Sequence, residues 1–286
     1  MTMPLSTHVA GRGTVDFRVT VSRLSGEGAG GVVIALEDYT QETRLRLDRE
    51  REAQARNSLQ RMLQRYLSPA IAARLADSPD SLTLGGERQE ITVLFADLRG
   101  FTTLAEQMPP EELVQVLNRY LALAVRVIFE HEGTLDKFLG DAIMAIFNAP
   151  LRQPDHVERA LRAALAIKRS VRECWPALSE QLRLDFGIGV NVGEAVVGNI
   201  GSLERMDYTA VGDCVNIAER LEEVAQPGQI LISHDVYERV RDRARVRSLQ
   251  SVSMRGRQTS TLAYELIDVE PSVSVSVPGA AAGDPG

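Results

Sequence analysis

Asp97 is the first residue of this sequence with a plausible role in metal or phosphate chemistry. It follows the apolar run ITVLFA (91–96), which is typical of a buried strand, and precedes a glycine turn from which a helix is expected to start. Such a turn would place the carboxylate beside free backbone N–H groups, a suitable place for a metal-bound phosphate. The residues of this turn are Leu98, Arg99, Gly100 and Phe101. The alternative is an aspartate that only caps or turns the chain.

Asp141 is the second candidate and lies in the turn of a predicted hairpin over residues 134–147. The strand before Asp141 is expected to lie beside the strand that ends at Asp97, so that the two carboxylates converge. Two hard oxygen ligands, together with phosphate oxygens, suit Mg²⁺ or Mn²⁺. The alternative for Asp141 is a plain turn residue.

The elements that must hold these aspartates alternate along the chain as β-α-β-β-α-β. One apolar face from Leu113 to Ile128 indicates a helix, and residues 157–174 indicate a second amphipathic helix. The remaining elements are the strand LDFGIGVNV (184–192), a glycine-punctuated loop, a helix over 214–224, the strand ILIS (230–233) and two late strands. This order predicts an α+β, ferredoxin-like domain with an antiparallel sheet and helices on one face.

The N-terminal part has a different pattern. Residues 15–24 alternate apolar and polar side chains, and a glycine-rich turn leads into VVIAL (32–36), which predicts an antiparallel β-hairpin. Residues 41–67 are rich in charge and lack Gly and Pro, which predicts a long helix. Apolar residues seven apart in it suit a short coiled coil, and a solvated helix packed on its own domain is the alternative.

Composition and charge exclude several classes of protein. The 286 residues are 44% hydrophobic and 25% charged, as in a globular protein and unlike a disordered or disulfide-framework chain. The net charge of −7 argues against general nucleic-acid binding. Two cysteines without a CxxC spacing fit a reducing cytoplasm, and no apolar stretch is long enough for membrane insertion. Among 32 basic residues the only lysines are Lys137 and Lys168.

Four motifs give the central region a resemblance to a known family. They are FADLRGFT (95–102), DKFLGDAIMAIF (136–147), GIGVNVGEAVVGNIGS (187–202) and MDYTAVGDCVNIAERLE (206–222). In this order they resemble the catalytic domain of class III nucleotidyl cyclases, most closely the bacterial adenylyl cyclases. The resemblance implies a catalytic domain over residues 87–268. Before it, residues 68–86 form an expected connecting helix and loop, and after it residues 269–286 form a tail that is expected to be disordered.

The resemblance implies roles for individual residues. Asp97 and Asp141 match the two metal-binding aspartates of the family, which would hold two Mg²⁺ or Mn²⁺ ions. Lys137 matches the lysine that recognises the base. Asn216 matches the asparagine that positions the ribose, and Arg220 matches the arginine that stabilises the transition state.

The implied reaction is attack of the ribose 3′-oxygen of ATP on the α-phosphorus, which forms 3′,5′-cyclic AMP and releases pyrophosphate with the help of two metal ions. Asn216 and Arg220 stand one helical turn apart, so both can reach one cleft. The alternative for Arg220 is a surface salt bridge with Glu223. In the family the site lies between two catalytic domains packed head to tail, so this chain, with one such domain, is expected to be a homodimer with two shared sites.

Three further positions bear on ligands. A lysine at Lys137 favours ATP, because guanylyl cyclases usually carry glutamate there. Thr209 stands at the partner position and matches a bacterial subgroup of adenylyl cyclases, some of which respond to bicarbonate or carbon dioxide, so this effector is a candidate. Arg255 stands where relatives carry a lysine for the terminal phosphates, and it keeps the positive charge.

The segment Glu37-Asp38-Tyr39-Thr40 resembles the end of a PAS sensor domain, with its Asp-x-Thr motif, running into a signalling helix over 41–67. Residues 1–40 are too few for a whole PAS fold. The hairpin is therefore either the last part of a larger sensor or an aid to dimerisation. The alternatives to an adenylyl cyclase are a guanylyl cyclase and a non-catalytic regulatory module on the same fold.

Overall fold

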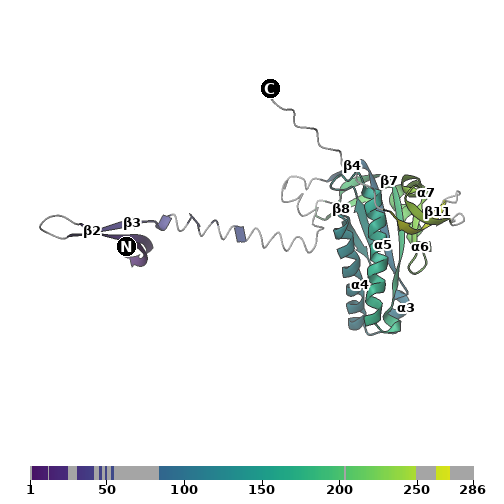
Figure 1. Cartoon of the computed structure of the whole chain (residues 1–286), viewed down its shortest axis with the longest axis horizontal. Helices are drawn as coiled ribbons and strands as arrows, with labels where there is room; N and C mark the ends of the chain where they lie inside the picture. The colour runs from purple at the N-terminus through teal and green to yellow at the C-terminus, as the bar shows by residue number, and fades with distance from the viewer. Residues whose placement is uncertain are drawn as a thin grey trace, which may run out of the picture. The chain divides into compact units, whose positions relative to one another are not determined.

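The computed structural model describes residues 2–11, 13–24, 31–41, 45, 46, 49, 53, 54, 84–202, 204–248 and 262–270. The chain divides into two compact units, Met1–Tyr66 and Leu67–Gly286 (Figure 1). Within the described ranges, no helix combines the length and the apolar character needed to cross a membrane. Most of the predicted signalling helix and of the predicted tail, the connecting helix and Arg255 lie outside the described residues.

The N-terminal unit contains an antiparallel sheet of three strands in the order β1-β2-β3. The strands are β1 (Thr2–Val9), β2 (Gly13–Leu24) and β3 (Gly31–Asp38). The predicted hairpin corresponds to β2 and β3, and β1 is an additional strand. Pro4 weakens the strand signal of β1, but β1 lies at the edge of the sheet, where a proline is tolerated.

Residues after β3 turn into helical backbone, as the described residues between 40 and 54 show. At this junction the Thr40 hydroxyl donates to the Asp38 carboxylate over 2.6 Å and accepts from the Asp16 backbone N–H over 2.8 Å. The Asp-x-Thr segment therefore fixes the chain where the strand ends.

The second unit is built on one large sheet in the order β10-β11-β9-β7-β4-β6-β5, with β8 paired to β7. All neighbouring strands run antiparallel except β7 and β9, which are parallel. The strands are β4 (Gly85–Arg99), β5 (Thr134–Leu139), β6 (Ala142–Phe147), β7 (Asp185–Gly201), β8 (Met206–Val211), β9 (Ile230–Ser233), β10 (Ala244–Ser248) and β11 (Ala263–Val269). The predicted α+β fold is confirmed, with a sheet that is mostly antiparallel.

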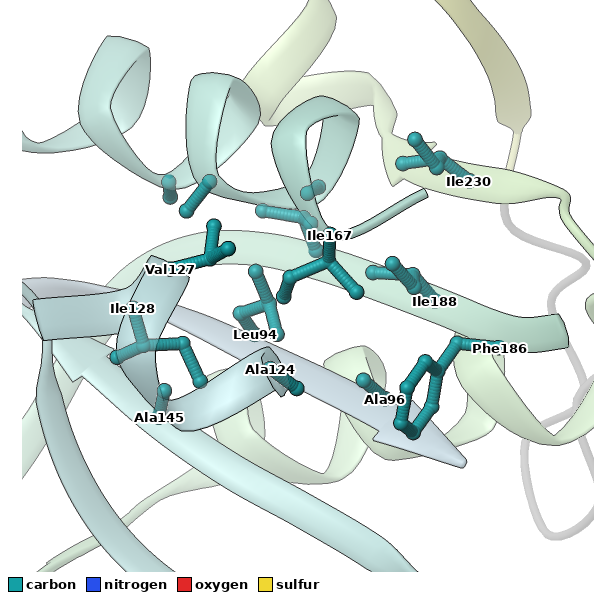
Figure 2. Close-up of a cluster of buried hydrophobic side chains, with 14 of the residues drawn as sticks. Leu94, Ala96, Ala124, Val127, Ile128, Ala145, Ile167, Phe186, Ile188 and Ile230 are labelled. Carbon is teal, nitrogen blue, oxygen red and sulfur yellow. The ribbon is translucent and has the colours of Figure 1, made fainter. Parts of the chain in front are cut away.

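Two long helices cover one face of this sheet, α4 (Pro110–Glu130) and α5 (His156–Cys174), and they lie side by side in Figure 1. The even-numbered residues Leu94, Ala96 and Leu98 of β4 point into this core. Figure 2 shows Leu94 and Ala96 packed with side chains of α4, α5, β6, β7 and β9. The short helical segments of the same unit are α3 (Phe101–Ala105), Trp175–Ala177, Glu180–Leu182 and α7 (His234–Val240).

A third helix, α6 (Asp213–Val224), packs on the opposite face, so the expectation of helices on one face only is wrong. The odd-numbered residues Ile91, Val93 and Phe95 of β4 pack with Ala218 of α6 in a separate cluster. A side chain at Gly189 of β7 would overlap the Ala218 carbonyl oxygen and the Glu222 backbone nitrogen. The glycines of GIGVNVG therefore leave the space in which α6 lies directly on the strand.

β7 is longer than expected, because the segment predicted as a glycine-punctuated loop continues it to Gly201. This second half pairs with β4 on one side and with β8 on the other. Ala195 and Val197 of this extension and Ala210 of β8 are buried in the same cluster as Ile91 and Met144. Side chains of the extension therefore pack on the face of the sheet on which α6 lies, and its pairing with β8 positions Thr209.

Candidate active site

Asp97 lies near the end of β4 and faces the α6 side of the sheet, because it continues the odd-numbered series of Ile91, Val93 and Phe95. It pairs across the strands with Ala142, the first residue of β6, and Asp141 directly precedes that residue. The expected neighbour was β5, the strand before Asp141, and this was wrong: β5 lies at the sheet edge beyond β6. The two aspartates still come together, through the strand that follows the turn.

The electrostatics of Asp97 agree with two carboxylates at close range. Burial raises the pKa of Asp97, and the negative charge of Asp141 raises it further, while Arg99 and a backbone N–H oppose the shift. Arg99 donates to the Asp97 carboxylate over 2.7 Å. A positive charge is therefore already placed beside one of the two carboxylates.

Arg99 also holds the end of α6. Its guanidinium pairs with the Glu222 carboxylate over 2.5 Å, and it donates to the backbone carbonyl oxygens of Glu222 and Ala225, the latter over 3.0 Å. The Glu222 side chain is only 8% exposed. Burial, opposed by the charge of Arg99, raises the pKa of Glu222 to about 7. Gly187 makes this arrangement possible, since a side chain there would overlap the Arg99 guanidinium.

The turn after Asp97 has the expected form. Gly100 has a φ of 85°, a left-handed conformation that favours glycine, and α3 begins at the next residue. The Leu98 side chain is buried in the core, so only its backbone groups are available to a ligand, whereas Phe101 is partly buried against that core. The binding of phosphate by residues 98–101 stays a prediction.

The donor set fits divalent metal ions in part. Asp97 and Asp141 supply hard carboxylate oxygens, which Mg²⁺ and Mn²⁺ prefer. Among the described residues there is no group of three or more His, Cys, Asp or Glu side chains that could hold a metal ion. The two aspartates would therefore need further oxygen ligands from the triphosphate or from water, as is usual for Mg²⁺.

A second cluster joins Lys137 of β5 with Thr209 of β8 through Asp136. The Thr209 hydroxyl donates to Asp136 Oδ2 over 2.5 Å, and Lys137 Nζ lies 3.3 Å from Asp136 Oδ1. Burial raises the pKa of Asp136, while the Thr209 hydrogen bond and the Lys137 charge oppose the shift. The two residues that sequence assigned to base recognition are thus within reach of one carboxylate, although 72 residues separate them in sequence.

Asn216 and Arg220 lie on α6, on the side of the helix that faces away from the sheet. The buried residues of α6 are Cys214, Ala218, Leu221 and Glu222, whereas Asn216 is exposed and Arg220 is half-buried. Over the part of the chain that the structure describes, no ion pair joins Arg220 to Glu223. The salt-bridge alternative for Arg220 therefore has no support.

The described residues thus form three groups: Asp97 with Asp141 and Arg99, Lys137 with Asp136 and Thr209, and Asn216 with Arg220. Arg255 lies outside the described residues. A hollow of about 420 Å³ lies beside the other ends of β4 and β7, is lined by Gly86, Arg152 and Tyr208 among others, and contains no member of these groups.

Sequence reasoning missed Asp136 and Glu222. Asp136 directly precedes Lys137 in the motif DKFLGD, so its position was visible but its partner was not. Glu222 had no sequence signal, because its role depends on contact with a residue 123 positions earlier.

Comparison with known proteins identifies the family. Residues 86–267 match the family model described as the adenylate and guanylate cyclase catalytic domain. Adenylate cyclase 1 of Rhizobium meliloti (strain 1021) is 37% identical over 199 residues, which are 68% of this chain and 30% of that protein. The chain spans about a third of the length of the bacterial curated relatives it matches.

Two solved structures agree with this assignment. The crystal structure of the adenylyl cyclase CyaB from P. aeruginosa is similar with a TM-score of 0.62 and 34% identity, covering 66% of this chain and all of that one. The crystal structure of the guanylyl cyclase Cya2 is similar with a TM-score of 0.62 and 38% identity, covering 67% of this chain and 98% of that one. This chain therefore belongs to the family of adenylate and guanylate cyclase catalytic domains, and it is close to the bacterial adenylate cyclases.

Proposed function

We propose that the protein is an adenylyl cyclase that converts ATP to 3′,5′-cyclic AMP and pyrophosphate. The observation that carries this proposal is the convergence of Asp97 and Asp141 where β4 ends and β6 begins, at a distance at which the charge of Asp141 raises the pKa of Asp97. Two such carboxylates repel each other, Arg99 offsets this only at Asp97, and divalent cations bound between them would offset it at both. A triphosphate bound with divalent cations would supply these charges.

In the proposed reaction the ribose 3′-oxygen forms a bond to the α-phosphorus as the bond to the pyrophosphate oxygen breaks, and the 3′-hydroxyl proton passes to solvent water. Asp97 and Asp141 would hold two Mg²⁺ or Mn²⁺ ions, whose chemistry is to stabilise negative charge on the reacting oxygens. Asn216 would orient the ribose. Arg220 would stabilise charge at the transferring phosphorus centre, a role that contributes about 10³ to 10⁵ in rate in other phosphoryl enzymes.

ATP is proposed as the substrate because Lys137 is a donor. The adenine base presents an acceptor at N1, whereas guanine presents an N–H donor there, which a lysine ammonium would oppose. The second candidate is a guanylyl cyclase, because the guanylyl cyclase Cya2 is 38% identical over the matched region.

The proposed active form is a homodimer with head-to-tail catalytic domains. Asn216 and Arg220 lie on the side of α6 that faces away from the sheet, and within the described part of one protomer no contact joins them to Asp97 or Asp141. A second copy could bring its Arg220 to the aspartates of the first. Arg255 is proposed to join Lys137, Thr209, Asn216 and Arg220 in the half of the site that this second copy supplies.

Regulation is also part of the proposal. Residues 1–40 would act as part of a PAS-like sensor and residues 41–67 as a signalling helix that alters the dimer interface. Bicarbonate or carbon dioxide is a candidate effector because of Thr209. A cytoplasmic location is proposed because Cys174 and Cys214 are both free thiols.

The decisive experiment incubates the purified protein with ATP or with GTP, in Mg²⁺ or Mn²⁺, and separates the products by chromatography. We expect cyclic AMP and pyrophosphate from ATP in equal amounts, and much less cyclic GMP from GTP. Formation of neither cyclic nucleotide at concentrations that give dimers would favour the non-catalytic regulatory module. A preference for GTP would favour the guanylyl cyclase.

A further inference from the structure

Asp136 lies at a β-bulge between β5 and β6. Leu135 pairs with Ala145 and Lys137 pairs with Met144, so Asp136 is the extra residue without a partner on the opposite strand. In a regular strand, successive side chains point to opposite faces. The bulge changes this alternation, and Asp136 can approach Thr209 while its neighbour Lys137 stays beside the same carboxylate.

The Asp136 side chain is fully buried, with 0% of its surface exposed. Its Oδ2 accepts the Thr209 hydroxyl proton, and its Oδ1 makes an ion pair with Lys137 Nζ but no aligned hydrogen bond among the described residues. The backbone N–H of Ala210 also interacts with this carboxylate, so Asp136 holds Thr209 and Lys137 from a fixed position at β8. It is too deeply buried to contact a nucleotide directly.

The hydrogen bond from Thr209 fixes what that hydroxyl can offer to a ligand. A hydroxyl has one hydrogen and two acceptor lone pairs, so a threonine that donates to Asp136 can only accept from a ligand. Lys137 has three N–H donors and no acceptor. Together, the two side chains present one acceptor and one donor.

We infer that Asp136 is a positioning residue that determines base specificity, by taking the Thr209 hydroxyl proton and holding Lys137 beside it. Adenine presents a donor on its 6-amino group next to an acceptor at N1, which complements Thr209 and Lys137. Guanine presents an acceptor at O6 next to a donor at N1, which both residues would oppose. This inference rests on the proposed function, since it explains how that site selects ATP.

The test is the variant Asp136→Asn, which keeps the shape of the side chain. An amide at this position can donate to Thr209 as well as accept from it, so the threonine hydroxyl becomes free to donate to O6 of guanine. We expect the ratio of kcat/KM for ATP to that for GTP to fall about ten-fold, the factor that corresponds to about 1.4 kcal/mol. We expect the change mainly in KM, because Asp136 does not touch the reacting atoms.

A double-mutant cycle separates positioning from a general structural effect. Thr209→Val removes the hydroxyl, so adding Asp136→Asn to it should lower the ATP-to-GTP ratio by much less than ten-fold. The matched control is Asp207→Asn, an exposed aspartate on the same strand as Thr209, which should leave the ratio unchanged. Thermal unfolding of each variant measures whether it is folded.

An unchanged ATP-to-GTP ratio in folded Asp136→Asn would overturn the inference, and so would an equal loss with both nucleotides. In either case the proposed function stands as long as the unmodified protein makes cyclic AMP. If the unmodified protein makes no cyclic nucleotide, the proposed function fails. The inference is then tested without turnover, by competition binding of non-hydrolysable ATP and GTP analogues. Only a fall in the ratio of ATP-analogue affinity to GTP-analogue affinity on Asp136→Asn supports the inference.

Discussion

The Arg99 guanidinium donates a hydrogen bond to the Asp97 carboxylate over 2.7 Å and also forms an ion pair with Glu222 on α6. One side chain therefore connects a proposed metal ligand at the end of β4 with the helix that carries Asn216 and Arg220. Displacement of α6 would therefore act on Asp97 through the Arg99 guanidinium. Gly187 leaves the space for this connection, since a side chain there would overlap the Arg99 guanidinium and approach the Ala225 carbonyl oxygen.

Replacement of Arg99 by alanine is expected to destabilise the catalytic unit. At pH 8, where Glu222 is mostly charged, it would keep its burial but lose its charge partner, and removal of one member of a buried ion pair costs about 3 kcal/mol or more. Urea unfolding followed by circular dichroism measures this free energy. The matched control is Arg88→Ala. Arg88 pairs with Glu194, their side chains are 74% and 67% exposed, and the pair should contribute less than about 1 kcal/mol. Equal small changes in both variants would contradict this role of Arg99.

Glu222 is expected to make stability depend on pH. Its pKa is about 7 in the folded protein against an ordinary 4.5, because burial disfavours the charge. Between these values the folded state holds a proton that the unfolded chain has released. The contribution of Glu222 to the free energy of unfolding therefore decreases as pH rises from about 4.5 to about 7, by about 3 kcal/mol at most. Above about pH 7 this contribution no longer changes.

The comparison that isolates this effect is Glu222→Gln against the unmodified protein in urea unfolding at pH 5, 6, 7 and 8, with EDTA present. Other groups titrate in both proteins, so the difference between them reports Glu222. We expect the variant to gain stability relative to the unmodified protein as pH rises. Glu194→Gln, which changes an exposed carboxyl, should show no such trend. A difference that is constant with pH would contradict the raised pKa.

Much of the fold could be predicted from periodicity. The apolar run before Asp97, the helical face from Leu113 to Ile128 and the turns at Gly100 and Gly140 each depend on neighbours in sequence, and these appear in the structure. The strand that ends at Asp97 was recognised by the same pattern, and strand alternation then places Asp97 on the α6 side. These features are local, so local patterns were sufficient.

The features that were missed depend on contacts between distant segments. The bulge at Asp136 shifts the pairing register of β5 against β6. The alternation pattern of a single strand cannot show such a shift. The extension of β7 was read as a loop because its glycines signal turns, whereas Gly198 is needed for close approach to the backbone of Gly85. Glu222 looks like any exposed helical glutamate until Arg99 is placed beside it.

Lys137→Glu is expected to lower the use of ATP. A carboxylate beside Asp136 would meet the adenine N1 acceptor with another acceptor and would face the buried carboxylate with a like charge. We expect kcat/KM for ATP to fall by about ten-fold or more, as for loss of a charged hydrogen bond. The control is Lys168→Glu, the only other lysine, which lies on α5 and should leave ATP use unchanged. An unchanged preference in Lys137→Glu would refute the base-recognition role.

Gly189→Ala is expected to displace α6. The new methyl group would overlap backbone atoms of Ala218 and Glu222, which cannot move without moving the helix. We expect a loss of about 3 kcal/mol in the free energy of unfolding and a loss of cyclase activity, since α6 carries Arg220. Gly193→Ala is the graded comparison, because its methyl group would meet the Cys214 side chain at 2.9 Å. A similar effect in both variants would mean that the helix does not depend on close approach at Gly189.

The shared site is tested by mixing two inactive variants. In the proposed homodimer, each site takes Asp97 and Asp141 from one protomer and Arg220 from its partner. Asp97→Ala and Arg220→Ala should therefore each abolish activity alone. A heterodimer of the two variants contains one site with both defects and one site with neither, so it should regain up to half of the activity of the unmodified dimer.

The mixture is assayed for cyclic AMP after co-expression with two different affinity tags and purification through both, so that only heterodimers are measured. The control is Asp97→Ala co-expressed with both tags and purified in the same way. It should stay inactive because both of its sites lack the same carboxylate. An inactive heterodimer, demonstrated by both tags, would mean that each protomer builds its site from its own residues. In that case Arg220 would have to reach Asp97 of its own protomer from the side of α6 that faces away from the sheet.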